Sequence, residues 1–268
     1  MIREIARRLN AVYPKGESRA IAQIIAEEAT GLSLSKILSS DLRLEDFPLA
    51  IEMTDRALRS EPIQHIIGWT MFCGHKIKCD RRALIPRPET EEMVEWILSK
   101  EKKGLRVLDI GTGSGCIATA FATAFEVTAI EKSDDAIELA HENFSANNVN
   151  VKIVKDDILR PSFSDEMYDI IVSNPPYIRT SEKALMDDNV LRYEPEMALF
   201  AEEERPLMFY EAIAEYGLRH LREGGRFYVE VNSALGEETA EVFRRYIYNN
   251  VSVRKDMFGN DRIVYGIK

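Results

Sequence analysis

The first part of the chain, residues 1–66, has a helical pattern of apolar and polar positions. Apolar residues recur there at spacings of three and four, the period of amphipathic helices. Ser18 is a candidate N-cap, and Gly31 is a candidate C-terminal stop. The expected helical segments are 2–13, 18–31, 33–40 and 45–60. The pattern predicts a small helical-bundle domain, whose role is either packing and dimerisation or substrate recognition.

The pattern changes over residues 67–88. Short apolar stretches interrupted by Gly74 predict a β-hairpin that links two domains. Pro86 and Pro88 then stiffen the chain before a helix with acidic residues in its first turn, where the helix dipole favours negative charge.

Residues 89–268 alternate between strand and helix patterns. The expected strands are 105–111, 126–133, 149–157, 167–176, 225–232, 251–257 and 261–268. The expected helices between them are 115–125, 133–148, 205–225 and 236–250. This order predicts an α/β domain with a mostly parallel, seven-stranded, Rossmann-like sheet that helices cover on both faces, closed by an antiparallel pair. Ligands of such sheets bind at the carboxyl ends of the strands.

Composition and charge exclude several classes of protein. No apolar run approaches the ~20 residues that span a bilayer. The N-terminus lacks the apolar core of a signal peptide. We therefore expect a cytoplasmic protein without a membrane partner. The net charge of −10 is unfavourable for general nucleic-acid binding. The three cysteines favour free thiols, and their spacing predicts no metal site.

A glycine-rich loop follows the first strand of the α/β domain, in the stretch VLDIGTGSGCIA. Glycines at alternate positions let the backbone pass close to a ligand. An acid before them, Asp109, suits a ligand with an ammonium group better than a pyrophosphate. The candidate cofactor-binding residues here are Asp109, Gly111, Thr112, Gly113, Ser114 and Gly115.

Acidic residues end the next two strands. Glu131 could accept hydrogen bonds from both hydroxyls of a ribose. Asp157 could bind an adenine amino group, with Asp156 as its rival, and Ile158 could pack on the ring. Together with the glycine loop, these residues resemble the Rossmann-like methyltransferases that use S-adenosylmethionine, and the resemblance implies S-adenosylhomocysteine as the product.

The fourth strand ends in the stretch SNPPYI. Two prolines fix φ and remove two backbone donors, which leaves carbonyl oxygens free to accept. The side-chain oxygen of Asn174 and the carbonyl of Pro175 could therefore hold both hydrogens of one planar NH2 group. Pro176 stiffens the turn, and Tyr177 supplies an aromatic wall. These four residues are candidate substrate-binding residues. Three of them, Asn174, Pro175 and Tyr177, are also candidate catalytic residues. Asn174 is in addition a candidate cofactor-binding residue. Orientation of such a weak nucleophile is worth up to ~7–11 kcal/mol.

Adenine, guanine and glutamine-amide methyltransferases share such a turn, so more of the chain must choose the acceptor. The stretches EPIQHIIG, ALIPRPETEEMVE, DIGTGSGCIA, SNPPYI, YEPEMAL and EGGRFYVEV occur in that order. Together they resemble the peptide chain release factor N5-glutamine methyltransferases, the PrmC/HemK family, over nearly the whole chain.

The resemblance implies a reaction and a partner. The methyl group of S-adenosylmethionine would pass to the side-chain amide nitrogen of the glutamine in the Gly-Gly-Gln loop of class 1 release factors, which would modulate translation termination. The helical domain and hairpin would then bind the release factor. Glu131 stands where many relatives have Asp, and Ile158 replaces an aromatic residue of some relatives. Arg87 and Glu194 lie in family-like segments and receive no chemical role.

Two other functions compete with this one. An amino methyltransferase acting on a nucleic-acid base would take the base out of its stack and would usually carry a basic face. The acidic charge and the lack of a Lys/Arg cluster disfavour it. A cofactor-binding factor without turnover is the third hypothesis, and the intact Asn-Pro-Pro-Tyr turn argues against it.

Overall fold

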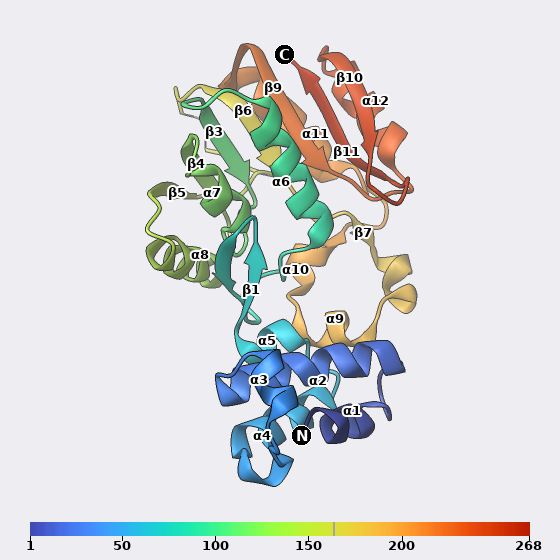
Figure 1. Cartoon of the computed structure of the whole chain (residues 1–268). Coiled ribbons are helices and arrows are strands. Elements are labelled where there is room, and N and C mark those ends of the chain that lie inside the picture. The colour runs from blue at the N-terminus through green and yellow to red at the C-terminus, as the bar shows by residue number, and fades with distance from the viewer. Residues whose placement is uncertain (163) are drawn as a thin grey trace. The chain divides into compact units, whose positions relative to one another are not determined.

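The structure is a computed structural model that describes residues 1–162 and 164–268. The chain divides into two compact units (Figure 1). The first comprises Met1–Trp69 together with Asp187–Tyr193, and the second comprises Thr70–Met186 and Glu194–Lys268.

The first unit is helical. Its elements are α1 (Ile2–Leu9), α2 (Lys15–Thr30), α3 (Leu34–Ser39), the 3-10 turn η1 (Leu44–Asp46), α4 (Pro48–Ala57), α5 (Ile63–Ile67) and α9 (Asp188–Tyr193). Gly31 ends α2 in the left-handed conformation, as expected. The predicted N-cap was wrong: α2 begins at Lys15, and the buried hydroxyl of Ser18 donates to the Tyr13 carbonyl 3.1 Å away. Pro14 suits a helix start, because the first helical positions need no amide donor.

The second unit is the α/β domain, and its seven-stranded Rossmann-like sheet confirms the predicted fold class. The sheet order is β10-β11-β9-β6-β3-β4-β5, with β11 antiparallel to both neighbours and the other pairs parallel. The strands are β3 (Arg106–Ile110), β4 (Glu126–Glu131), β5 (Val151–Lys155), β6 (Tyr168–Ser173), β9 (Leu221–Glu230), β10 (Asn249–Lys255) and β11 (Asp261–Ile267).

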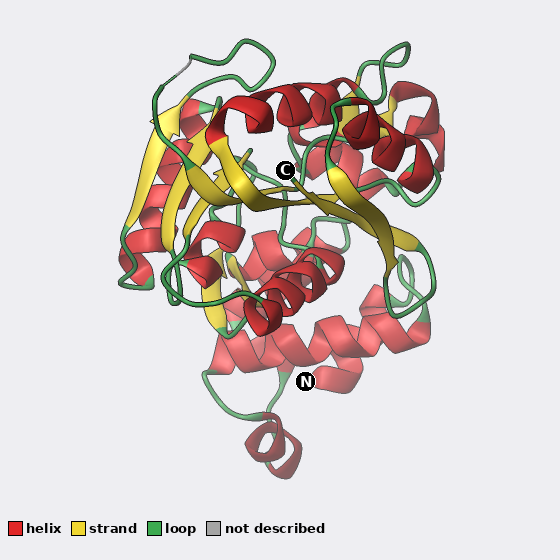
Figure 2. Ribbon diagram, turned by 90° about the horizontal axis from the view of Figure 1, so that it is seen from above, coloured by secondary structure: helices red, strands yellow, loops and turns green. Residues whose placement is uncertain are grey.

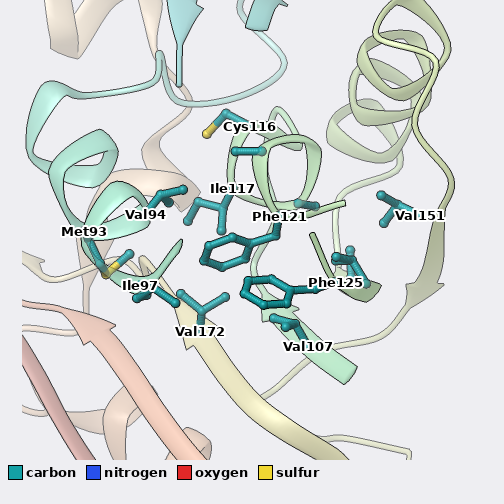
Figure 3. Packing of buried hydrophobic residues seen from close by; sticks show 14 of the residues in the cluster. Met93, Val94, Ile97, Val107, Cys116, Ile117, Phe121, Phe125, Val151 and Val172 are labelled. Carbon is teal, nitrogen blue, oxygen red and sulfur yellow. The ribbon is translucent and has the colours of Figure 1, made fainter. Parts of the chain in front are cut away.

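Helices cover both faces of this sheet (Figure 2). One face packs against α6 (Pro88–Lys100), α7 (Cys116–Phe121) and α8 (Asp134–Ala146), and the other packs against α11 (Met208–His220) and α12 (Gly236–Arg245). In the first of these cores, the rings of Phe121 and Phe125 meet edge to face with centroids 5.4 Å apart (Figure 3).

The predicted hairpin consists of β1 (Trp69–Phe72) and β2 (His75–Lys78). Phe72 and Ile77 are buried in the core that α6 and α7 share. The backbone of Lys78 also exchanges hydrogen bonds with the Asn143 side chain on α8, at 2.7 and 3.2 Å. The hairpin is therefore held by side chains of the sheet domain.

Two parts of the domain differ from the sequence-based expectation. The helix expected over 205–225 ends at His220, because the buried Leu221 pairs with Tyr168 of β6 and begins β9. Between β6 and α11 the chain forms short elements that the pattern did not predict: β7 (Ile178–Arg179), η2 (Thr180–Leu185), α10 (Glu196–Leu199) and β8 (Phe200–Ala201). No helix in the described part of the chain is long and apolar enough to cross a membrane.

Candidate active site

Two loops predicted to carry chemistry lie side by side at the carboxyl edge of the sheet. They follow β3 and β6, which are adjacent parallel strands with Ile110 opposite Ser173. The Ser173 hydroxyl donates to the Ile110 carbonyl at 2.7 Å and ties the strand ends together. The strand order reverses here, since β4 and β5 extend the sheet on one side of β3 and β6 lies on the other. Such a reversal is the usual ligand crevice of an open α/β sheet.

The glycine loop begins at the end of β3. Gly111, Gly113 and Gly115 all have positive φ, between 55° and 78°. The Gly111 and Thr112 amides donate to the Ile130 carbonyl at 2.8 and 3.2 Å, which joins the loop to β4. A methyl group on Gly111 would meet nothing within 4 Å, whereas one on Gly115 would lie 2.7 Å from the Phe144 ring. Gly111 therefore leaves open space for a ligand, and Gly115 lets α8 approach the loop.

We expect Gly115→Ala to lower the free energy of unfolding by about 2–5 kcal/mol, because left-handed strain and overpacking add. The matched control is Gly224→Ala, since Gly224 has nearly the same φ of 76° but nothing within 4 Å of the added methyl. Urea unfolding should show a smaller loss for the control, of about 1–2 kcal/mol. Equal losses in the two variants would contradict the close packing at Gly115.

Glu131 lies at the end of β4 and is buried. Its Oε2 accepts the Gly113 amide at 2.9 Å, and its Oε1 accepts the amides of Lys132 and Ser133 at 2.8 and 2.9 Å. A carboxylate offers about four acceptor positions. Three are occupied, so this arrangement leaves one acceptor position, on Oε2. Binding both hydroxyls of a ribose, as the sequence led us to expect, requires displacement of one backbone amide.

Asp109 lies beneath the loop, is fully buried and does not line the cavity that the loop borders. Its Oδ2 accepts from the Thr112 hydroxyl at 2.6 Å, and its Oδ1 has no hydrogen-bond partner in the described part of the chain. Burial, opposed by the Thr112 hydrogen bond, raises the pKa of Asp109 to about 7. This buried acid could compensate a cationic ligand group bound above it.

The raised pKa of Asp109 predicts a pH dependence of stability. The unfolded chain loses this proton near 3.8 and the folded chain near 7, so the contribution is complete below pH 4 and is lost as pH rises to about 7. We expect the melting temperature of cofactor-free Asp109→Asn to rise relative to that of the unmutated protein as pH increases over this interval. Asp135→Asn, at an exposed position of α8, is the control. An unchanged pH profile in Asp109→Asn would contradict the assignment.

Asp157 and Ile158 follow β5 and line the same cavity. The Asp157 carboxylate is already engaged: Oδ2 lies 2.9 Å from the Lys132 ammonium, and Oδ1 accepts the Leu159 amide at 3.0 Å. Burial acts to raise the pKa of Asp157, but these partners outweigh it and the net shift is downward. Asp157 is therefore an ionised acceptor at neutral pH. Its predicted rival, Asp156, also lines the cavity.

The Asn-Pro-Pro-Tyr turn continues directly from β6. Asn174, Pro175 and Pro176 line the cavity. The Asn174 Nδ2 donates to the Thr90 hydroxyl at 3.0 Å. Within residues 1–162 and 164–268, neither the Asn174 Oδ1 nor the Pro175 carbonyl accepts a hydrogen bond. Two acceptors at the cavity wall are therefore open to a ligand that brings its own N–H groups.

Tyr177 is oriented differently from the other residues of the turn. It borders a second, smaller pocket with Glu182, Asn232 and Arg262 rather than the main cavity. Its hydroxyl donates to Glu230 Oε1 at 3.1 Å. Burial next to Glu230 raises the pKa of Tyr177 well above the usual tyrosine value. The structure therefore does not bring the Tyr177 ring to the main cavity.

An ion pair with a buried carboxylate holds another part of the cavity wall. Glu194 Oε1 lies 2.5 Å from the Arg87 guanidinium, and its Oε2 accepts the Ile85 amide at 3.0 Å. The Glu194 side chain is only 1% exposed. The ion pair fixes the segment 85–87, which lines the cavity, to the start of the segment 194–200. Sequence reasoning singled out both residues without finding this pairing, because they are separated by 107 positions.

The cavity bordered by these loops has a volume of about 290 Å³. Its wall is mainly apolar, with polar groups from the glycine loop, Glu131, Asp157 and Asn174. The sequence analysis missed several lining residues: Arg82, Ala83, Thr90, Met197, Phe200 and Phe209. Ala83 and Thr90 lie in the stretch ALIPRPETEEMVE and Met197 lies in YEPEMAL, but no local pattern marks Arg82, Phe200 or Phe209. The open glycine backbone, the free acceptor on Glu131 and the buried Asp109 fit a cofactor that carries a ribose and an ammonium group.

One group of possible metal ligands lies outside this cavity. In the described part of the chain, ligand atoms of Cys73, Glu91 and Glu95 lie within 4.8 Å of one another. Burial and the neighbouring carboxylates raise the pKa of the Cys73 thiol to about 12, so it does not offer a thiolate at neutral pH. The Cys73 amide instead donates to Glu91 Oε1 at 2.6 Å.

Comparisons with known proteins identify the chain's relatives. A family model described as the methyltransferase small domain matches residues 90–192. The release factor glutamine methyltransferase of Flavobacterium psychrophilum is 39% identical over 97% of this chain and 95% of its own length. That of Lactococcus lactis is 40% identical over 88% of each. A methyltransferase crystal structure from Pyrococcus furiosus matches 73% of this chain and 89% of its own, with a TM-score of 0.55 and 21% identity, which shows a shared fold.

Proposed function

The chain belongs to the release factor glutamine methyltransferases, and on that premise we propose that it methylates the side-chain amide nitrogen of a release factor glutamine. The methyl donor is S-adenosylmethionine, and the acceptor is the glutamine of the Gly-Gly-Gln loop in class 1 release factors. Methylation there modulates translation termination. Because its substrate acts on the ribosome, the enzyme works in the cytoplasm.

The observation that carries this proposal is the pair of open acceptors at the end of β6. A glutamine side chain ends in a planar amide with two N–H groups. The Asn174 Oδ1 and the Pro175 carbonyl, which accept no hydrogen bond from residues 1–162 and 164–268, suit these two groups. Holding both hydrogens directs one face of the amide nitrogen toward the glycine-loop side of the cavity. Orientation matters here because an amide nitrogen is a weak nucleophile.

The cofactor site is assigned to the loops after β3, β4 and β5. Gly111 to Gly115 would pass beneath the amino-acid part, Glu131 would accept a ribose hydroxyl, and Asp157 with Ile158 would border the adenine. Asp109 would act from beneath the loop, because a bound ammonium group favours its ionised form. When bound, S-adenosylmethionine supplies a methyl group on a sulfonium, whose C–S bond breaks as the N–C bond forms, leaving the neutral thioether of S-adenosylhomocysteine.

One proton leaves the glutamine nitrogen after the transfer. The glutamine nitrogen gains a methyl group and becomes cationic, so it readily loses one of its hydrogens to water. A strong base before attack is unnecessary. The carbonyl of Pro175 and the Oδ1 of Asn174 stabilise the developing positive charge, because they are dipoles with their negative ends toward the nitrogen.

We assign recognition of the release factor to the helical domain, taken as residues 1–66, and to the hairpin segment 67–88, with the transfer reaction in residues 89–268. The support for this assignment is that the acceptors, the glycine loop and the acidic strand ends all belong to the sheet domain. The compact helical unit has its own core and carries none of these residues.

The test is methyl transfer from S-adenosylmethionine to an unmethylated class 1 release factor, with duplex DNA and ribosomal RNA in parallel reactions. Mass spectrometry of the Gly-Gly-Gln peptide should show one added methyl group on the glutamine and none on either nucleic acid. Transfer to nucleic acid alone would reject the proposal and would indicate that the turn holds a base.

A further inference from the structure

A buried hydrogen-bond chain extends from Asn174 into the protein. The Asn174 Nδ2 donates to Thr90 Oγ1 at 3.0 Å, and Thr90 Oγ1 donates to Glu230 Oε2 at 2.5 Å. Thr90 lies in the first turn of α6 and Glu230 ends β9, and both are almost fully buried. Neither residue belongs to the turn that holds the acceptor amide.

The donors and acceptors of this hydrogen-bond chain all point one way, because the chain ends at a carboxylate. A carboxylate only accepts hydrogen bonds, so Thr90 must direct its single proton at Glu230. The Thr90 oxygen can then only accept, and its partner on Asn174 must be the NH2 group. The Asn174 Oδ1 is thereby left for the cavity. Reversing the Asn174 amide would place two acceptors against each other at 3.0 Å.

The surroundings of Glu230 maintain its acceptor role. The Tyr177 hydroxyl donates to its other oxygen, Oε1, at 3.1 Å. Burial gives Glu230 a net raised pKa, and the Thr90 and Tyr177 hydroxyls and the nearby positive charge of Arg262 limit that rise by favouring the ionised form. If Glu230 were protonated, it would have to donate to the Thr90 or the Tyr177 hydroxyl. The direction of the hydrogen bonds from Asn174 to Glu230 would then no longer be determined.

We propose that Glu230, acting through Thr90, is a positioning residue that sets which end of the Asn174 amide faces the acceptor glutamine. Tyr177 contributes by engaging the second oxygen of Glu230, which gives this member of the turn a role away from the main cavity. The inference rests on the proposed function, because it explains how Asn174 is kept ready for an NH2 group.

The experiment compares two buried glutamates of the sheet domain. Glu230→Gln removes the fixed direction, since a glutamine can present either an oxygen or an NH2 to Thr90. Glu101→Gln is the matched control, because Glu101 also accepts from a tyrosine hydroxyl, that of Tyr228 at 2.6 Å, and its side chain is only 4% exposed. Glu101 borders neither pocket. For each variant, steady-state methylation of a release factor, calorimetric binding of S-adenosylmethionine and the melting temperature are measured.

We expect Glu230→Gln to lower kcat by about tenfold to a hundredfold, by analogy with the loss seen when a residue that orients a metal-binding side chain is replaced. The affinity for S-adenosylmethionine should stay within about twofold of the original, and Glu101→Gln should keep its kcat despite a similar loss in melting temperature. A kcat for Glu230→Gln equal to that of Glu101→Gln would overturn the inference. Failure of the unmutated protein to methylate would instead reject the proposed function.

A second pair of variants keeps the test decisive if Glu230→Gln does not fold. Thr90→Val has nearly the shape of threonine but cannot relay a hydrogen bond, whereas Thr90→Ser can. The valine variant should lose kcat to the same extent as Glu230→Gln, and the serine variant should recover most of it. Equal kcat values for the two Thr90 variants would overturn the inference.

Discussion

Asn174→Ala should lower kcat for release factor methylation by about a hundredfold to a thousandfold, the usual loss when one preorganised polar group of an active site is removed. The variant loses the Oδ1 acceptor and leaves only the Pro175 carbonyl to orient the amide. Because Asn174 contributes at most about one hydrogen bond to the cofactor, affinity for S-adenosylmethionine should change by less than about tenfold.

The control for this variant is Asn147→Ala. Asn147 also donates through its amide, to the Lys76 and Asn143 carbonyls at 3.0 and 2.9 Å, but it does not line the cavity. Loss of the Asn147 side chain should lower the free energy of unfolding by about 1 kcal/mol and leave kcat unaffected. Circular dichroism and single-turnover transfer separate folding from chemistry. Substantial turnover by a folded Asn174→Ala protein would remove Asn174 from the proposed mechanism.

Glu131→Ala should weaken S-adenosylmethionine binding by about tenfold to a hundredfold, because a charge-assisted hydrogen bond is worth roughly 1.5–3 kcal/mol. The variant also leaves the amides of Gly113, Lys132 and Ser133 without their carboxylate partner. The glycine loop then loses its connection to the end of β4. We therefore expect a fall in both cofactor affinity and melting temperature, which calorimetry and thermal unfolding would measure.

Two further variants define what Glu131 contributes. Glu131→Gln should bind S-adenosylmethionine nearly as poorly as the alanine variant does, since the NH2 group of the glutamine would face a backbone N–H. Glu166→Ala is the control, because Glu166 also accepts from two side chains, those of Lys152 and Tyr168, at a site outside the cavity. If cofactor affinity in Glu131→Ala equals that in Glu166→Ala, Glu131 is not a cofactor ligand.

The main features of the fold follow from local sequence patterns. Apolar strands that alternate with amphipathic helices predict a parallel sheet covered on both faces, and β3 to β6 and α6 to α12 confirm this class. Ser133, the first residue of the helix expected over 133–148, is its N-cap, and its hydroxyl accepts the Ala136 amide at 3.3 Å. Capping and turn residues act through neighbours a few positions away, so the sequence alone indicates them well. The family, predicted from ordered motifs, is confirmed by relatives that match nearly the whole chain.

Some local signals were overridden by distant contacts. The helix expected through Gly225 ends at His220 because Leu221 is buried in a strand pairing with Tyr168, more than fifty positions away in the chain. There, burial of a side chain by tertiary packing outweighs a weak local preference. The wrong N-cap has a local cause instead: α2 begins just after Pro14, and the Ser18 hydroxyl donates to the Tyr13 carbonyl five positions earlier.

By itself, the sequence determined that a glycine loop and a rigid Asn-Pro-Pro-Tyr turn end two strands of one sheet. That follows from short-range sterics, because glycine and proline set backbone angles within a few residues. Only the tertiary structure decided which distant side chains contact these loops and the cavity wall. Thr90 meets Glu230 across 140 positions and Asn174 across 84, and Glu194 meets Arg87 across 107. No periodic pattern in the sequence indicates such pairs, because a buried carboxylate meets its hydrogen-bond donors only when the packed helices and strands bring them together.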